Sequence, residues 1–280
     1  MKKHNIDYNV TKGISVIIPS YESLEDIREC IYSLLSLNAP WLEIIVVDNN
    51  SSEDVIRYLV ELKDEEKIKL ILNQKNLGFT YAVNQGIEIA EKDNDIVLLN
   101  NDAIVTKNAL QLLQKAAYEL DDCGMTVPQQ ILPANTKTIN THVPFANNNM
   151  ACDVNLSAHH KNIINVPLFH NGEYTEISFA PFFCVYIKRD TYNMSIGLDA
   201  ELGRHFRSDM IYCNYVRSVL NKKIYHVSNA RVYHKLQQST TILKEKSETE
   251  HDILYVQNRW SEEEQEKYGF KRAKWDFDPE

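Results

Sequence analysis

The chain has 280 residues, 44% hydrophobic and 25% charged, a balance typical of a globular protein with one large α/β domain or two modest ones. Thirty basic against 39 acidic residues give a net charge of −9, which argues against a broad nucleic-acid-binding face, and we expect no nucleic-acid partner. Five widely spaced cysteines without a Cys-x-x-Cys motif indicate neither a zinc site nor a disulfide framework. The polar start of the chain and the lack of any apolar run of about 18 residues lead us to expect a cytoplasmic protein without a secretory signal or membrane span.

Four strand–helix units are predicted in roughly the first 120 residues. Short aliphatic runs predict buried strands over residues 14–19, 42–47, 68–72 and 95–99. Apolar residues at helical spacing follow each run, and Ser23, Ser52 and Thr106 are the expected N-caps of three of the helices. The alternation predicts a mostly parallel, Rossmann-like sheet with right-handed crossovers, flanked by helices.

The second half of the chain has a different pattern. Residues 128–177 show little periodicity and are typical of a binding loop or lid. Residues 176–188 predict an antiparallel strand, 196–199 a turn, 209–220 a helix, and 223–227 and 230–234 short strands. A capping box at Ser247 predicts a further helix, and residues 262–274 a charged one. We therefore expect a parallel α/β half (1–128), a smaller antiparallel half of the same domain (129–240) and a helical extension (241–280).

Polar residues follow each of the four predicted strands. They are Ser20-Tyr21, Asp48 to Asn50, Asn73 to Asn76, and Asn100 to Asp102. Ligands of open α/β sheets bind in the crevice at the carboxyl ends of the strands, where these residues would meet. A carboxylate among amides is suited to holding a divalent cation against a phosphate. The alternative is a set of ordinary polar turns, since Asn and Asp are favoured in turns.

In this order, the segments resemble the family-two glycosyltransferases of the GT-A fold, and within them the bacterial rhamnosyltransferase-like branch. The resemblance covers roughly residues 14–234. The matching segments are Ser15-Val-Ile-Ile-Pro-Ser-Tyr21, Ile44-Ile-Val-Val-Asp-Asn-Asn-Ser-Ser52, Asn76-Leu-Gly-Phe-Thr-Tyr-Ala-Val-Asn84, Leu98-Leu-Asn-Asn-Asp102, Ile196-Gly-Leu-Asp199, Ser208-Asp209 and Ala230-Arg-Val-Tyr-His234.

The resemblance implies a role for each matching residue. Asp102 would hold a Mn²⁺ or Mg²⁺ ion on the donor diphosphate, with Asn100 in a weaker role where the family has its first aspartate. His234 would be a further metal ligand. Asp209, in the place of the second residue of the family's Glu-Asp pair, would be the catalytic base. The residues expected around the nucleotide-sugar are Pro19, Tyr21, Asp48, Asn50, Asn76, Gly78, Asn84, Asn100 and Asn101, with Asp48 on the nucleotide base.

The implied activity is transfer of a sugar from a nucleotide-sugar donor to a glycan or lipid-linked acceptor in polysaccharide biosynthesis. In-line attack assisted by one carboxylate base inverts the anomeric carbon. Because such acceptors are often lipid-linked, the resemblance is compatible with peripheral contact at the inner face of a membrane, without a membrane span. The C-terminal aromatics, from Trp260 to Phe277, are the segment suspected of that contact, and packing on the domain is the alternative.

Other interpretations remain open at this point. Ser208 stands where the family has a glutamate, and with Asn100 it leaves open a nucleotide-binding module with weakened catalysis. A sugar-phosphate nucleotidyltransferase would carry a Gly-rich loop after the first strand, where this chain has Pro19 to Glu22. Considered singly, Asp209 also suits a helix N-cap, and His234 also suits a hydrogen-bonded histidine at a strand end.

Overall fold

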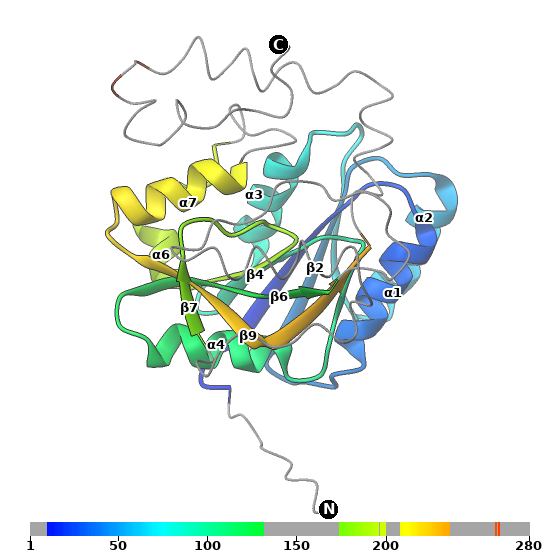
Figure 1. Cartoon of the computed structure of the whole chain (residues 1–280). Coiled ribbons are helices and arrows are strands. Elements are labelled where there is room, and N and C mark those ends of the chain that lie inside the picture. The colour runs from blue at the N-terminus through cyan, green and yellow to red at the C-terminus, as the bar shows by residue number, and fades with distance from the viewer. Residues whose placement is uncertain are drawn as a thin grey trace, which may run out of the picture.

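The computed structural model describes residues 10–131, 174–195, 197–199, 208–235, 261 and 263. These residues form one mixed sheet with helices packed against it (Figure 1). The strands are β1 (Ile14–Ser20), β2 (Leu42–Asp48), β3 (Lys69–Leu72), β4 (Asp95–Leu99), β5 (Ala103–Val105), β6 (Cys123–Ile131), β7 (Tyr174–Ile177), β8 (Cys184–Ile187) and β9 (Lys223–His234). The helices are α1 (Leu24–Leu35), α2 (Glu53–Asp64), α3 (Phe79–Ile89), α4 (Ala109–Glu119), α6 (Arg189–Met194) and α7 (Ser208–Ser218).

The sheet has the order β3-β2-β1-β4-β8-β6-β9-β5, and β7 pairs with β9 outside this path. Strands β3, β2, β1 and β4 are parallel. Every residue of β1 and β4 is buried, which agrees with a strand covered by helices on both faces. The four predicted strands and the α/β class are therefore confirmed.

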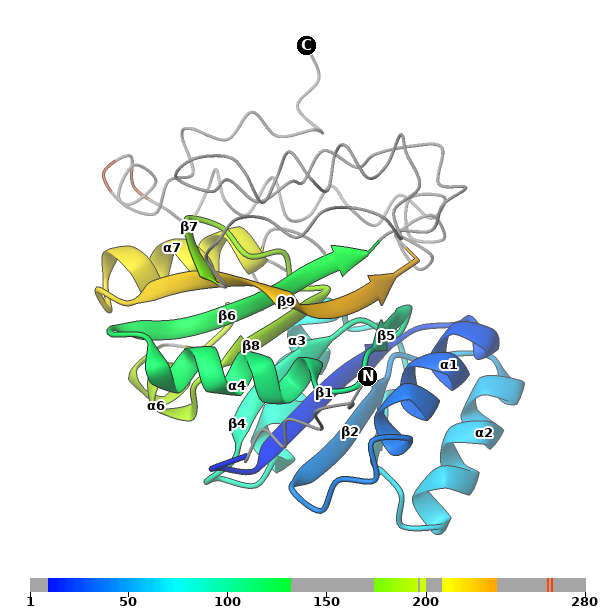
Figure 2. The ribbon, with the colours of Figure 1, turned by 60° about the horizontal axis from the view of Figure 1, so that its bottom comes forward.

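Helices cover both faces of this parallel half. Helices α1, α2 and α4 lie on one face and α3 on the other (Figure 2). Helix α3 packs very close to the sheet at Gly86, where an added Cβ would lie 2.4 Å from Ile17 Cγ2 and 3.3 Å from Val47 Cγ2. A glycine is required there because any larger residue would push the helix off the strands.

The second half completes the sheet with mixed pairing. Strand β8 is antiparallel to β4 and to β6, and β9 is parallel to β6 with register shifts. The segment predicted as one antiparallel strand, 176–188, is two strands, β7 and β8, joined by residues 178–183. The two short strands predicted over 223–234 are the single strand β9. Strands β5 and β6 and helix α6 were not predicted.

The expected N-caps are only partly right. Ser23 precedes α1 but has a left-handed backbone (φ 58°), and its hydroxyl donates to the Asp26 carboxylate instead of accepting a backbone amide. Ser52 precedes α2, and its hydroxyl donates to Asp54. Thr106 is wrong as a cap: its hydroxyl donates to the carbonyl of Arg231, because β5 occupies the residues just before it.

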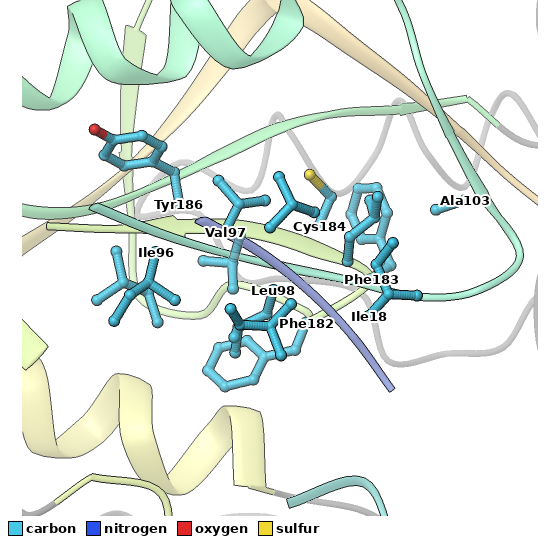
Figure 3. Packing of buried hydrophobic residues seen from close by; sticks show 14 of the residues in the cluster. Ile18, Ile96, Val97, Leu98, Ala103, Phe182, Phe183, Cys184 and Tyr186 are labelled. Atoms are coloured by element: carbon cyan, nitrogen blue, oxygen red, sulfur yellow. The ribbon is translucent and has the colours of Figure 1, made fainter. Parts of the chain in front are cut away.

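A continuous apolar core fills both faces of the sheet. Figure 3 shows Tyr186 and Cys184 on one side of the strands and Ile96, Leu98 and Phe182 on the other. The amino end of β4 carries the buried carboxylate of Asp95. It accepts hydrogen bonds from the hydroxyls of Tyr118 and Tyr186 and from the backbone amide of Arg189. The carboxylate thereby ties α4, β8 and α6 to the centre of the sheet.

Several predictions lie outside the described residues. They are most of the irregular segment 128–177, the helix opened by Ser247, the helix over 262–274 and the C-terminal aromatics. The boundary expected at residue 128 falls inside β6, and the division of the chain into parts stays a prediction. Among the described residues, no helix has both the length and the apolar character needed to cross a bilayer.

Candidate functional site

The carboxyl ends of the parallel strands bring the predicted polar residues to one edge of the sheet. Strands β1, β2, β3 and β4 end there, and so do β6 and β9, because both run parallel to β4. Backbone hydrogen bonds continue past the strand ends, from Asn49 N to Ser20 O (2.8 Å) and from Asn73 N to Asp48 O (2.9 Å). The loops at this edge therefore start from fixed positions.

Asp48 closes β2 with a fully buried carboxylate. Both of its oxygens are bound by Ser51: the backbone amide donates to Oδ2 (3.0 Å) and the hydroxyl to Oδ1 (2.5 Å). Burial raises the pKa of Asp48, and the hydrogen bonds from Ser51 partly oppose the rise. The Ser51 hydroxyl also accepts the amide of Glu22, so the loops after β1 and β2 are joined.

The loop after β3 is held by amide side chains. Asn49 Nδ2 donates to the carbonyl of Gly78 (3.2 Å), and its Oδ1 accepts Asn73 Nδ2 (2.9 Å). Asn76 Oδ1 accepts the backbone amide of Gly78 (2.8 Å). Gly78 has φ 89°, a conformation that favours glycine, and it is the N-cap residue directly before α3. Asn76 and Gly78 are thus brought beside the end of β2; the parallel order predicted this edge for Asn76, and the family resemblance for Gly78.

Asp102 and His234 lie side by side, although they are far apart in the sequence. Strand β5 pairs with β9 so that Ala103 lies opposite His234. Asp102 Oδ1 is 3.1 Å from His234 Nε2, and both side chains are almost completely buried, at 5% and 8% exposed. Asn100 Nδ2 lies 3.2 Å from the same ring nitrogen. These three predicted residues therefore form one group, which we call the Asp102–His234 pair with Asn100.

Apolar and sulfur groups enclose this pair. The ring of Phe183 stacks on His234 with centroids 5.1 Å apart, and the backbone amide of Asn100 donates to the Phe183 carbonyl. The Cys30 thiol donates to the Asn100 carbonyl (3.5 Å). Burial raises the pKa of Cys30 well above its ordinary value, and Asp102 adds to the rise, so Cys30 stays a neutral thiol. The enclosure lowers the local dielectric and strengthens charge interactions at the pair.

Asp209 lies in the first turn of α7, half-buried. One turn further on, the Cys213 thiol packs on Ala180, accepting its amide at 3.3 Å. Residues four apart share a helix face, so Asp209 lies on the side of α7 that faces the segment leading to Phe183. Its carboxylate contributes to the raised pKa of Cys213, after burial. The structure therefore brings the predicted base toward the enclosing segment.

The other predicted residues take varied positions along the edge. Pro19 is buried in β1, Tyr21 is half-buried just after it, and Asn50 is exposed with a left-handed backbone. Asn84 Nδ2 donates to the carbonyl of Leu198 (2.8 Å), which links α3 to the turn after α6. Asn101, between Asn100 and Asp102 in the sequence, is buried.

The residues at the Asp102–His234 pair fit a divalent cation. A carboxylate oxygen and an imidazole nitrogen are both within reach of a single ion, and both are ordinary ligands of divalent metal ions in proteins. The described residues hold no group of three His, Cys, Asp or Glu side chains able to bind a metal. An ion held by these two protein ligands would take its remaining ligands from other groups, such as phosphate oxygens or water.

Sequence reasoning missed several residues of this edge. Ser51 had a signal, because a serine three residues after an aspartate can bond back to its carboxylate. Asn49 adjoins predicted residues and was not singled out. Phe183 and Gln130, which lies 2.7 Å from His234 Nδ1, had no signal, since their neighbours depend on which strands pair.

Comparison with known proteins decides the family. The sequence model described as glycosyl transferase family 2 matches residues 15–193, well over half of the chain. The chain belongs to this family. The matched range runs from β1 through β8 into α6, so Asp48 and Asp102 both lie within the part of the chain that matches the family.

A relative with a known name is similar to a limited part of the chain. Poly-beta-1,6-N-acetyl-D-glucosamine synthase of Staphylococcus aureus (strain COL) is 29% identical over 108 residues, which are 39% of this chain and 26% of that protein. The chain thus matches about a quarter of the length of this relative.

Solved structures share the GT-A-type fold. A crystal structure of GalNAc-T7 with UDP, GalNAc and Mn²⁺ has a TM-score of 0.62 at 15% identity, covering 81% of this chain and 43% of that one. The mannosyltransferase PcManGT from Pyrobaculum calidifontis, in complex with GDP-Man and Mn²⁺, has a TM-score of 0.57 at 14% identity, covering 95% and 70%. The fold expected from the sequence is confirmed.

Proposed function

We propose that this protein is an inverting, metal-assisted glycosyltransferase that moves a sugar from a nucleotide-sugar donor to a glycan or lipid-linked acceptor. The observation that carries the proposal is the Asp102–His234 pair with Asn100 at the carboxyl edge of β4. It lies on the same sheet edge as Asp48, in a chain of glycosyl transferase family 2.

The donor would lie along this edge. Strand β1 separates β2 from β4, so the ends of β2 and β4 lie about 10 Å apart at ordinary strand spacing. The nucleoside would lie at the β2 end, among Pro19, Tyr21, Asp48, Asn50 and the loop from Asn76 to Gly78. The diphosphate would lie at the β4 end, near Asn100, Asn101 and Asp102, with Asn84 toward the sugar.

Asp102 and His234 would hold a Mn²⁺ or Mg²⁺ ion. Such an ion, when bound, supplies positive charge that offsets the charge building on the leaving diphosphate. Asp102 supplies the only carboxylate of the pair, because Asn100 is neutral, so substitution of Asp102 should be the more damaging change. The two similar structures, one with UDP, GalNAc and Mn²⁺ and the other with GDP-Man and Mn²⁺, support this assignment.

Asp209 would act as the general base. Its carboxylate would accept the proton of the acceptor hydroxyl as that oxygen attacks the anomeric carbon from the face opposite the diphosphate. The support is its half-buried place on α7, whose Cys213 packs on the segment leading to Phe183 and the pair. A single base and in-line attack give an inverted product.

The proposed acceptor class rests on a relative of the chain. The S. aureus relative is named for synthesis of a polysaccharide, which favours a growing glycan as acceptor. A lipid-linked acceptor would place the protein at the inner face of a membrane. The C-terminal aromatics suspected of that contact lie outside the described residues.

The donor assignment is tested by nucleotide binding. Thermal unfolding with UDP, GDP, dTDP or CDP, each with and without Mn²⁺, should show one nucleotide that stabilises the protein only with the metal. A ligand at 100 times its dissociation constant adds about 2.7 kcal/mol to the free energy of unfolding, or roughly 5–10 °C in Tm for a domain of this size. Asp102→Ala should abolish the Mn²⁺-dependent shift, whereas Asp64→Ala, at an exposed carboxylate on α2, should keep it. If Asp102→Ala keeps the shift, the donor site is elsewhere.

The base assignment is tested by sugar transfer. Asp209→Asn should bind the donor with wild-type affinity and lose about 10²–10⁴-fold in transfer rate, the usual contribution of a general base. Normal transfer by Asp209→Asn would mean that another group is the base. A wild-type protein that binds nucleotide with Mn²⁺ but neither transfers nor hydrolyses any donor would instead be a binding module.

A further inference from the structure

The His234 ring has a neighbour at its second nitrogen that the proposed function leaves unexplained. Nε2 faces Asp102 and Asn100, while Nδ1 lies 2.7 Å from Nε2 of the Gln130 side chain. Gln130 belongs to β6, which pairs with β9, and it lies opposite Val232, two residues before His234. Phe183 stacks on the ring. The imidazole is therefore held at its face and at both nitrogens.

A neutral imidazole carries one proton, on one of its two nitrogens. Without a cation, a proton on Nε2 would be donated to the Asp102 carboxylate, and Nδ1 would then accept the Gln130 NH₂ group. A cation at Nε2 requires the lone pair of that nitrogen, so the proton must be on Nδ1 and needs an acceptor there. Whether the partner of Nδ1 donates or accepts thus decides whether the proton is more stable on Nε2 or on Nδ1.

A side-chain amide can serve both forms. Turning the Gln130 amide by 180° replaces its NH₂ group by its carbonyl oxygen, so the same residue can donate to Nδ1 or accept from it. Met at this position could do neither, and Glu could only accept. The 2.7 Å distance leaves no room for a water molecule between the two groups.

We propose that Gln130 is a positioning residue: with its amide turned, its carbonyl oxygen accepts the Nδ1 proton of His234 and so stabilises the form of the ring whose Nε2 can bind the divalent cation. This inference rests on the proposed function, because it requires His234 to be a metal ligand. Partners of this kind on metal-bound histidines fix the orientation of the ring, and their loss typically weakens metal binding about 10–100-fold.

The test measures Mn²⁺ binding by isothermal titration of Mn²⁺ alone and of Mn²⁺ at saturating UDP, or whichever nucleotide shows the metal-dependent shift. Gln130→Met should raise the Mn²⁺ dissociation constant about 10-fold or more. Gln130→Glu, which keeps an acceptor, should remain within about threefold of wild type. Gln111→Met, the same chemical change on α4, should leave the constant unchanged and serves as the matched control.

A second measurement separates positioning from mere packing. Imidazole ¹⁵N shifts, with the His234 signal assigned by its absence in His234→Ala, should show the proton on Nε2 without metal and on Nδ1 with diamagnetic Mg²⁺ and nucleotide. Gln130→Met should lose the clear Nδ1–H form, and Gln130→Glu should retain it. If Gln130 only packs against the ring, neither Gln130→Met nor Gln130→Glu should change the ¹⁵N shifts of His234.

The outcomes distinguish this inference from the function on which it rests. If His234→Ala abolishes Mn²⁺ binding while Gln130→Met binds Mn²⁺ as wild type does, the role of Gln130 is refuted and the metal site stands. If His234→Ala binds Mn²⁺ normally, both the metal site and the role of Gln130 are overturned. Weak binding by Gln130→Met with recovery in Gln130→Glu supports the inference.

Discussion

His226 makes the stability of this fold depend on pH. It is buried in β9, and among the described residues neither of its ring nitrogens has a hydrogen-bond partner. Burial lowers its pKa from 6.5 to about 4, because the charged imidazolium cannot be solvated there. The folded protein therefore keeps His226 neutral at a pH where the unfolded chain already binds a proton.

The sign and size of the effect follow from this difference. Because the unfolded state binds more protons, stability falls as the pH drops below 6.5, and the fall ends below about 4. The loss attributable to His226 is about 2 kcal/mol at pH 5 and approaches about 3 kcal/mol at lower pH. His226→Leu removes the titrating group at similar volume, so this part of the loss should vanish.

The assay is urea denaturation of wild type and His226→Leu at several pH values between 7.5 and 4.5. Relative to the variant, the wild type should lose about 2 kcal/mol of unfolding free energy between pH 7.5 and pH 5. Val227→Ala, in the same strand and without a titrating group, should lower stability by an amount independent of pH. Parallel pH curves for wild type and His226→Leu would refute the reasoning.

Two further substitutions test the packing of the sheet. Asp95→Ala removes the acceptor of two tyrosine hydroxyls, one of them that of the buried Tyr186, and of a backbone amide, and should lower the free energy of unfolding by about 3 kcal/mol or more in urea denaturation. Asp93→Ala, at an exposed carboxylate, should lower it by less than about 0.5 kcal/mol. Equal losses in the two variants would contradict the role of Asp95. Gly86→Ala places a methyl group 2.4 Å from Ile17 Cγ2 and should lower the free energy of unfolding by about 1–3 kcal/mol, despite the better helix propensity of alanine. An increase in Tm would show that α3 can shift without cost.

The parallel half of the fold was predictable because its signals are local. Each buried strand is a short apolar run, and the run ends in polar residues that a parallel order must bring to one edge. The presence of Asp48 and Asn76 at the same edge follows from that order. The exception is Thr106, which was predicted as an N-cap although it directly follows β5 and the helix begins only at Ala109.

The second half was less predictable because its contacts are not local. Strand β6 has few alternating residues, and nothing in its sequence indicates that it lies between β8 and β9. The likeness to a family supplied His234 as a site residue, since no spacing rule links it to Asp102. Gln130 and Phe183 were found only once the strand pairing was known.

The pairing of β5 with β9 has a consequence for how the protein folds. Asn100 and His234 are separated by 134 positions in the chain, and strand register alone brings them together. Contacts between such distant residues form slowly, because the entropy cost of closing a long loop comes before the contact can stabilise the chain. Strand β9 also pairs with β6 and β7, so its arrival completes most of the second half. A folding intermediate with only the parallel strands formed would have Asp48 and the end of β2 in place before Asp102 and His234 could meet at the proposed metal site.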